Sequence, residues 1–189
     1  RHGVGGVLTV AADRAVPVVA AVAERLGLPG IGVDVAVRMT DKLAMRGALA
    51  AAGVPQPRYA PVRDIGDARD ALATVGTPAV LKPVDSGGQR GLGLVERESE
   101  LDAALDAALD ASASGVALLE ELVPGVERNT MLVVRGGVPE VLTVSDRVRP
   151  SGRGFGVALA HLYPSSLDRP VTAEVERVAA DAVRALGLR

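Results

Sequence analysis

The 189-residue chain contains no cysteine, no tryptophan, two tyrosines and one phenylalanine. Without cysteine it can form neither a disulfide framework nor a thiolate metal site, and it has no cysteine nucleophile. This composition is compatible with a reducing compartment, and we expect a cytoplasmic protein. The low aromatic content of 2% and the net charge of -2 offer neither a stacking platform nor a basic footprint, so they disfavour nucleic acid as a partner.

The sequence also lacks long apolar runs. No run approaches the length of a membrane span, and the first residues do not have the form of a signal peptide, so we expect no membrane partner. Apolar residues nevertheless make up 48% of the chain, which is enough to fill the core of one domain or two small ones. The chain starts without Met and close to a strand-like segment, and it ends just past a helical pattern. We therefore expect an excerpt of a longer protein, truncated at both ends.

The most informative stretch runs from Val80 to Val95. A short apolar run reaches Lys82, four glycines fall within the seven residues 87–93, and a second apolar run follows. This pattern predicts a strand, a flexible loop and a strand, whereas a P-loop or a dinucleotide fingerprint would lead from its glycines into a helix. A glycine-rich backbone can turn its N–H groups towards an anion, and Lys82 and Arg90 would add charge. Phosphate contact is therefore favoured over a solvated turn.

Periodicity and turn residues predict an α+β chain. The N-terminal part should contain a strand at 7–10, a helix at 13–26, a short helix at 33–38 and a helix at 41–52 capped by Thr40. The middle should contain a strand at 58–61, a helix capped by Asp67 and ending at Val75, the glycine hairpin, a helix capped by Ser99 and a strand at 116–119. The remainder should contain a hairpin of 127–134 with 141–147, a polar loop at 150–156, a strand at 157–163 and a helix at 172–186.

Three segments in this order resemble the ATP-grasp ligases: Thr40-Asp41-Lys42, Leu81-Lys82-Pro83 with its glycine loop, and the acidic stretch from Glu120 to Glu127. The resemblance implies an ATP-grasp fold, in which two α+β subdomains grip ATP. It divides the chain into the tail of a preceding α/β domain (1–39) and an ATP-grasp domain (40–189), which comprises a lid (about 58–118) and part of the large subdomain (119–189). Ser145-Asp146-Arg147 and the segment from His161 to Ser165 look most like the branch that joins carboxylates to amines.

The resemblance also implies residue roles. Lys42 and Lys82 match the lysines that contact the ATP phosphates, where a compact cation suits phosphoryl transfer. The loop that folds over the phosphates comprises Ser86, Gly87, Gly88, Gly91 and Gly93. The residues that match the adenine and ribose contacts are Glu120 through its side chain, Glu121 and Val123 through the main chain, and Glu127 through its carboxylate. Many relatives carry Lys where Glu121 stands. On their own, Lys42 would be read as a surface lysine and the acidic stretch as a solvated strand end.

The implied reaction transfers the γ-phosphoryl group of ATP to a carboxylate, and an amine then attacks the acyl phosphate to give an amide, ADP and phosphate. Lys82, Arg147 and His161 are the catalytic candidates, and Arg153 is a further candidate to hold an anion; His161 could equally be a locally hydrogen-bonded strand residue. Mg²⁺ would bridge the phosphates, with its main ligands beyond Leu186, and Asp146 is expected to be a strand carboxylate facing water. The alternatives are a biotin-carboxylase-like enzyme that activates bicarbonate and a non-catalytic ATP-binding module.

Overall fold

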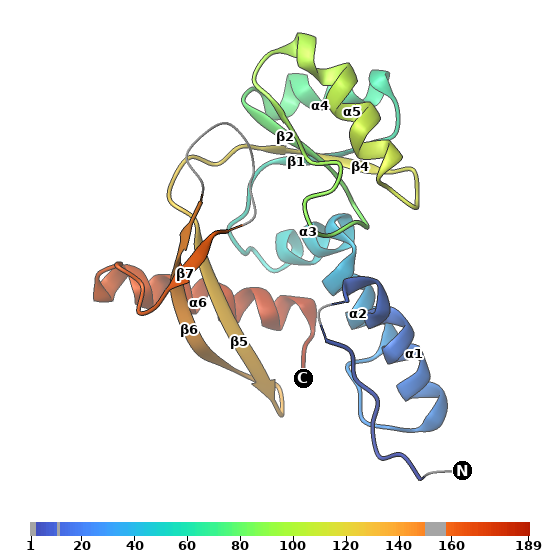
Figure 1. Ribbon diagram of the computed structural model, residues 1–189, viewed down its shortest axis with the longest axis vertical. Coiled ribbons are helices and arrows are strands. Elements are labelled where there is room, and N and C mark those ends of the chain that lie inside the picture. The colour runs from blue at the N-terminus through green and yellow to red at the C-terminus, as the bar shows by residue number, and fades with distance from the viewer. Residues whose placement is uncertain (1–2, 11, 150–157) are drawn as a thin grey trace.

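The computed structural model describes residues 3–10, 12–149 and 158–189 and contains two antiparallel sheets (Figure 1). The strands are β1 (Tyr59–Val62), β2 (Ala79–Pro83), β3 (Gly93–Val95), β4 (Ala117–Glu121), β5 (Arg128–Arg135), β6 (Val138–Val148) and β7 (Ala160–Leu162). The α-helices are α1 (Val16–Leu26), α2 (Val33–Thr40), α3 (Lys42–Ala51), α4 (Ile65–Val75), α5 (Leu101–Asp110) and α6 (Arg169–Leu186), with short 3-10 helices η1 (Asp13–Ala15) and η2 (Glu98–Glu100). The predicted α+β class is confirmed.

The first sheet has the strand order β1-β4-β2-β3, and α4 and α5 pack against it. The predicted glycine hairpin is confirmed, because β2 and β3 pair in antiparallel fashion with Leu81 opposite Gly93. Leu81, Val95 and Leu119 are fully buried in the core between this sheet and its helices. An apolar run in β2 is expected from this position, because β2 is a central strand with β4 on one side and β3 on the other.

The second sheet has the order β5-β6-β7, and α6 packs on β6. The turn of the predicted β5–β6 hairpin is formed by Gly136 and Gly137, whose φ angles of 56° and 80° are those that a two-residue hairpin turn requires. Helix α6 begins at Arg169, three residues earlier than predicted. The predicted loop at 150–156, with Arg153, lies outside the described residues, as does Val157.

Helix α3 lies between the two sheets (Figure 1). Its Leu49 forms a small buried cluster with Val54 and with Leu186 of α6. The first turn of α3 meets the first sheet, because the N–H of Lys42 donates to the carbonyl oxygen of Val84 at 2.9 Å. Helix α3 is therefore held from both sides. Among the described residues, no helix is long and apolar enough to cross a membrane.

The strand predicted at 7–10 was wrong. Leu8 and Val10 are 80% and 78% exposed, and within the described part of the chain no strand pairs with this segment. An apolar pattern favours an extended segment, but a strand is stable only beside a partner that takes up its backbone hydrogen bonds. The apolar pattern was therefore an insufficient signal.

The cap predicted for α3 was also wrong. Asp41, rather than Thr40, caps this helix, because its Oδ1 accepts a hydrogen bond from the N–H of Ala44 at 2.8 Å. The Thr40 hydroxyl instead donates to the carbonyl oxygen of Ala36, in the last turn of α2. A carboxylate at the N-cap also interacts favourably with the helix dipole.

Two other predicted caps were displaced by a few residues. Asp64, rather than Asp67, caps α4, and Asp67 accepts a hydrogen bond from the N–H of Arg63. Before α5, the carboxylate of Glu100 accepts from the N–H of Glu96, and Ser99 does not cap the helix. Several residues able to cap stand close together at each helix start, and spacing alone does not select among them.

Candidate functional site

A cluster of charged side chains lies where α3 meets β2 and β4. Glu120 is only 4% exposed; its Oε2 accepts from Lys82 Nζ at 2.5 Å and its Oε1 from Arg46 Nε at 2.6 Å. The register places Val80 opposite Glu120, so Lys82, two residues along β2, lies on the same face as this carboxylate. The structure thus brings together Lys82 and Glu120, two of the residues predicted from the sequence.

Charges of both signs act on the lysines and the carboxylate of this cluster. Burial raises the pKa of Glu120, but the hydrogen bond from Arg46 and the charge of Lys82 hold it below the ordinary value. Burial, followed by the nearby charge of Lys82, lowers the pKa of Lys42. Arg46 and Lys82 thus hold the buried carboxylate, while Lys42 is repelled by Lys82 and attracted by the nearby carboxylates. An added anion would relieve the repulsion between the two lysines.

Lys42 is also joined to the glycine loop. Its Nζ donates to the carbonyl oxygen of Ser86 at 2.7 Å, and Ser86 is 5% exposed. Asp41 caps the helix at the residue before Lys42, which fixes the start of α3. Lys42 is therefore not the solvated surface lysine that its helix alone suggested.

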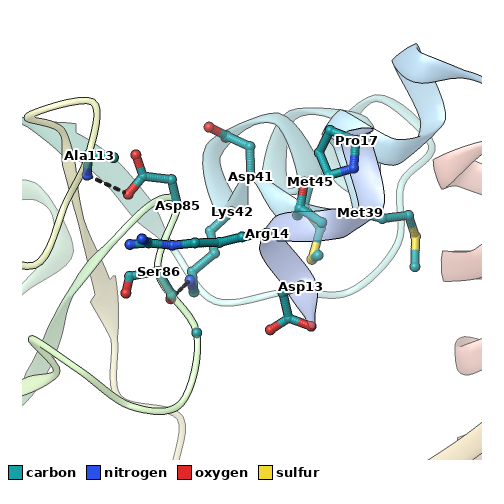
Figure 2. A pocket seen from close by; sticks show the side chains of 12 residues that line it. Asp13, Arg14, Pro17, Met39, Asp41, Lys42, Met45, Asp85, Ser86 and Ala113 are labelled. Carbon is teal, nitrogen blue, oxygen red and sulfur yellow. Dashed lines mark hydrogen bonds between the residues drawn. The ribbon is translucent and has the colours of Figure 1, made fainter. Parts of the chain in front are cut away.

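A pocket of about 470 Å³ opens beside Lys42 and the start of the glycine loop (Figure 2). One wall comes from η1 and α1 through Asp13, Arg14 and Pro17. Gly87 approaches this wall so closely that a Cβ added to it would lie 2.5 Å from Asp13 Oδ2. The N-terminal segment, which sequence reasoning assigned to a preceding domain, thus contributes directly to the site.

Gly91 and Gly93, predicted as parts of the phosphate-covering loop, pack against α5. A Cβ on Gly91 would lie 2.6 Å from the carbonyl oxygen of Ala107 and 2.6 Å from Ala111 Cβ. A Cβ on Gly93 would lie 2.9 Å from Ala104 Cβ. These two positions require glycine for close approach of the hairpin to the helix. In contrast, a Cβ on Gly88 would meet no atom within 4 Å.

Asp85 anchors the start of the glycine loop to the turn that follows α5. Its carboxylate accepts from the N–H of Ser114 at 2.8 Å, from the N–H of Ala113 at 3.2 Å and from Ser112 Oγ at 3.1 Å. Burial raises the pKa of Asp85, but these hydrogen bonds outweigh it and hold the pKa below the usual value. Sequence analysis assigned Asp85 no role.

The predicted adenine contacts lie at the end of β4. The carboxylate of Glu121 pairs with Arg58 Nε at 3.1 Å. The main-chain N–H of Glu121 donates to the carbonyl oxygen of Arg58 at 2.9 Å. The side chain of Glu121 is therefore engaged with the residue that precedes β1. Val123 follows just past the strand, with a 59% exposed side chain.

A second group of predicted residues gathers on the other sheet. The Glu127 carboxylate lies 3.3 Å from Arg147 Nη1 and 2.8 Å from Arg149 Nη1. Arg147 stands opposite His161 in the pairing of β6 with β7. His161 Nδ1 is 3.5 Å from Ser145 Oγ, a long contact that leaves the local hydrogen-bonding role of His161 weak.

The Asp146 carboxylate, predicted to face water, is 20% exposed and is also held by hydrogen bonds. It accepts from Ser165 Oγ at 2.5 Å and from the N–H of Ser166 at 3.0 Å. Arg128 Nε lies 3.0 Å away, close enough for an ion pair although it makes no hydrogen bond. The bonds from Ser165 and Ser166 lower the pKa of Asp146 to about 2. Within the part of the chain that the structure describes, no three or more His, Cys, Asp or Glu residues could hold a metal ion together.

Sequence analysis missed Arg46 as well as Asp85. A usable signal existed for Arg46, because it stands four residues after Lys42 and so lies on the same face of α3. The approach of Asp13 to Gly87 had no comparable signal, since it depends on how η1 packs.

The sequence of this chain matches a known family and curated proteins. A family model described as an ATP-grasp domain matches residues 47–189. A D-alanine–D-alanine ligase from Desulforudis audaxviator is 34% identical over 176 residues, which cover 88% of this chain and 57% of that protein. A D-alanine–D-alanine ligase from Cupriavidus taiwanensis is 30% identical over 174 residues, or 88% of this chain and 53% of that protein. The chain spans little more than half the length of these curated relatives.

Solved structures share the fold. An L-amino acid ligase from Bacillus licheniformis superposes with a TM-score of 0.81 at 23% identity. The superposition covers 98% of this chain and 43% of the ligase chain. A biotin carboxylase from Campylobacter jejuni gives a TM-score of 0.78 at 19% identity and covers 92% of this chain and 41% of its own. At these identities the likeness concerns the fold alone. The family model, in contrast, matches most of the sequence, and the chain therefore belongs to the ATP-grasp family.

Proposed function

We propose that this chain is the ATP-binding part of an ADP-forming ligase that joins a small-molecule carboxylate to an amine. The observation that carries the proposal is the convergence of two lysines on the glycine loop: Lys42 bonds to Ser86 in the loop, and Lys82 lies on the strand that leads into it. Such a cluster fits a polyphosphate, because phosphate oxygens would accept from both ammonium groups. Family membership and the similarity to D-alanine–D-alanine ligases support the same activity.

In this proposal, Lys42 and Lys82 bind the phosphates and the loop at 86–93 excludes water from them. The Glu120 carboxylate and main-chain groups of Glu121 and Val123 bind the adenine. Glu127 accepts hydrogen bonds from the ribose through the lone pairs that its pairing with Arg147 and Arg149 leaves available. When bound, Mg²⁺ would neutralise phosphate charge during transfer.

The acceptor side of the reaction is assigned to the second sheet. Arg147 and His161 are neighbours across β6 and β7. The guanidinium of Arg147 suits a carboxylate or an acyl phosphate, since it can donate two parallel hydrogen bonds. Positioning and charge neutralisation are the main sources of rate in phosphoryl transfer, so no side-chain nucleophile is required.

The proposed division of the chain is a preceding-domain tail at 1–39 and an ATP-grasp domain at 40–189, with the lid at about 58–118. Although Asp13 and Arg14 belong to the tail, they line the pocket beside Lys42. This contact supports a ligase in which the preceding domain forms one side of the substrate site. We place the reaction in the cytoplasm, where ATP and amino acids are available.

The test is a coupled assay of nucleotide turnover by the intact protein with Mg²⁺ and ATP. D-alanine, other amino acids and amino-acid pairs are supplied in turn, and we expect ADP release only when both a carboxylate and an amine are present. AMP release would contradict the ligase. Bicarbonate-dependent ADP release without an amine would instead support the biotin-carboxylase-like alternative, and ATP binding without turnover would support a non-catalytic module.

A further inference from the structure

Arg46 and Lys82 both pair with the buried carboxylate of Glu120. Arg46 Nε donates to Glu120 Oε1, and Lys82 Nζ donates to Oε2. The side chain of Arg46 is 19% exposed, that of Lys82 is 18% exposed and that of Glu120 is 6% exposed. Neither Arg46 nor Glu120 lines the pocket beside Lys42, and the side chain of Arg46 joins the charged cluster through its ion pair with Glu120. The main chain of Arg46 also belongs to α3, the helix that Lys42 begins.

The two partners of Glu120 come from different parts of the fold. Lys82 and Glu120 lie on adjacent strands of the first sheet, whereas Arg46 belongs to α3, which packs against α6 through Leu49. The main chain of Arg46 is itself fixed, because its carbonyl oxygen accepts from Gln56 Nε2 at 3.0 Å. Arg46 thus reaches Glu120 from a firmly held element.

The second cation matters for the charge of Glu120 when Lys82 binds a phosphate. A phosphate that draws the ammonium group of Lys82 towards itself weakens the interaction of Lys82 with Glu120. A buried carboxylate that loses its partner is costly, because its desolvation is no longer offset. Arg46 supplies a second cation that stays with Glu120 when Lys82 turns away.

We infer that Arg46 is a positioning residue of the nucleotide site: by remaining paired with Glu120, it allows Lys82 to exchange this carboxylate for a phosphate and keeps Glu120 aimed at the base. This inference rests on the proposed function. A carboxylate held in this way accepts from the amino group of adenine and repels the oxygen that hypoxanthine carries at the same position. Arg46 should therefore affect the choice of base as well as affinity.

A merely structural Arg46, which only joined α3 to the first sheet, makes different predictions. Its loss would lower the unfolding temperature, but the preference for ATP over ITP would not change. Its effect on nucleotide binding would also persist after Glu120 was neutralised. Base preference and dependence on the Glu120 charge are therefore the decisive measurements.

The experiment measures the Kd values of ATP and ITP by calorimetry, with Mg²⁺ and without amine substrate, on intact wild-type protein and variants. We expect Arg46→Met to weaken ATP binding about tenfold or more and ITP binding less, so that discrimination falls. Arg46→Lys should restore most of both values. In a Glu120→Gln background, Arg46→Met should change ATP binding by less than about twofold, because a neutral amide needs no counter-cation.

Arg177→Met is the matched control. Arg177 pairs with Glu174 and Asp181 on the exposed side of α6, so the same substitution removes two ion pairs away from the cluster; we expect wild-type Kd values. If Arg46→Met binds ATP with wild-type affinity and preference, or loses as much affinity in the Glu120→Gln background, the inference is overturned while the proposed function stands. If the wild-type protein does not bind ATP, the proposed function fails and the inference fails with it. Thermal unfolding of each variant confirms that the comparison concerns folded protein.

Discussion

Lys42 Nζ donates to the carbonyl oxygen of Ser86 at 2.7 Å, which joins the first residue of α3 to the start of the glycine loop. A second link runs through the main chain, from the N–H of Lys42 to the carbonyl oxygen of Val84. The same lysine thus shapes the loop and, in the proposed function, binds the phosphates that the loop covers. A bound phosphate would compete with Ser86 for this ammonium group.

Lys42→Met should therefore weaken ATP binding and loosen the loop together. We expect the Kd for ATP to rise about tenfold or more, since a charged partner of the phosphates is lost. Trypsin should cleave after Arg90 faster than in the wild-type protein, and ATP should protect this bond only in the wild-type protein. Mass spectrometry of the digest and calorimetry measure the two effects. Unchanged cleavage together with unchanged affinity would contradict the role given to Lys42.

The pKa of Lys42 gives a prediction about proton linkage. Burial and Lys82 lower this pKa from 10.5 in the folded protein, so between the lowered value and 10.5 the folded state has lost a proton that the unfolded state keeps. A bound polyphosphate favours the charged form and raises the pKa again. ATP binding in this alkaline window should therefore take up protons, whereas Lys42→Met should take up fewer. Calorimetry in two buffers of different ionisation enthalpy measures the uptake, and equal values for the two proteins would exclude Lys42 as its source.

Alanine substitutions at Gly91 and Gly88 distinguish the cost of a packing clash from the cost of backbone strain. Both have positive φ angles, of 65° and 68°, so alanine at either position carries a similar conformational cost. Only Gly91 faces α5, where a Cβ would lie 2.6 Å from the carbonyl oxygen of Ala107. Gly91→Ala should therefore lower the free energy of unfolding by about 1–3 kcal/mol more than Gly88→Ala. Urea denaturation measures the difference, and equal losses would mean that the hairpin moves away from α5 at little cost.

The sequence predicted the features that depend on neighbours along the chain. The run from Val80 to Val95 contains both strands and the turn residues of one hairpin, so its pairing could be predicted locally. No local pattern predicted the pairing of Lys82 with Glu120; the family resemblance placed both residues at one site without stating their contact. This pairing requires β2 and β4 to be neighbours, which is a property of the whole sheet.

What the sequence did not predict depends on packing between distant elements. Arg46 reaches Glu120 only because α3 is wedged between the first sheet and α6. Asp85 acquires its role from a turn almost thirty residues later, where main-chain N–H groups converge on its carboxylate. The segment at 7–10 shows the opposite failure, because its pattern suits a strand but the described residues offer it no partner.

Asp146 provides a test of the second sheet by pH. Its pKa is about 2 in the folded protein, against an ordinary 3.8, so its contribution to stability is complete above about pH 3.8 and is lost as the pH falls through about 2. Asp146→Asn should be less stable than the wild-type protein at pH 7, since the amide accepts more weakly from Ser165 and Ser166 and does not pair with Arg128. The difference in stability between the two proteins should narrow as the pH falls across this window.

Urea denaturation at several pH values measures this difference. Asp106→Asn, on the exposed face of α5, is the matched control, for which we expect no such narrowing. A difference for Asp146→Asn that stayed constant from pH 7 to pH 2 would show that the hydrogen bonds to Asp146 do not depend on its charge.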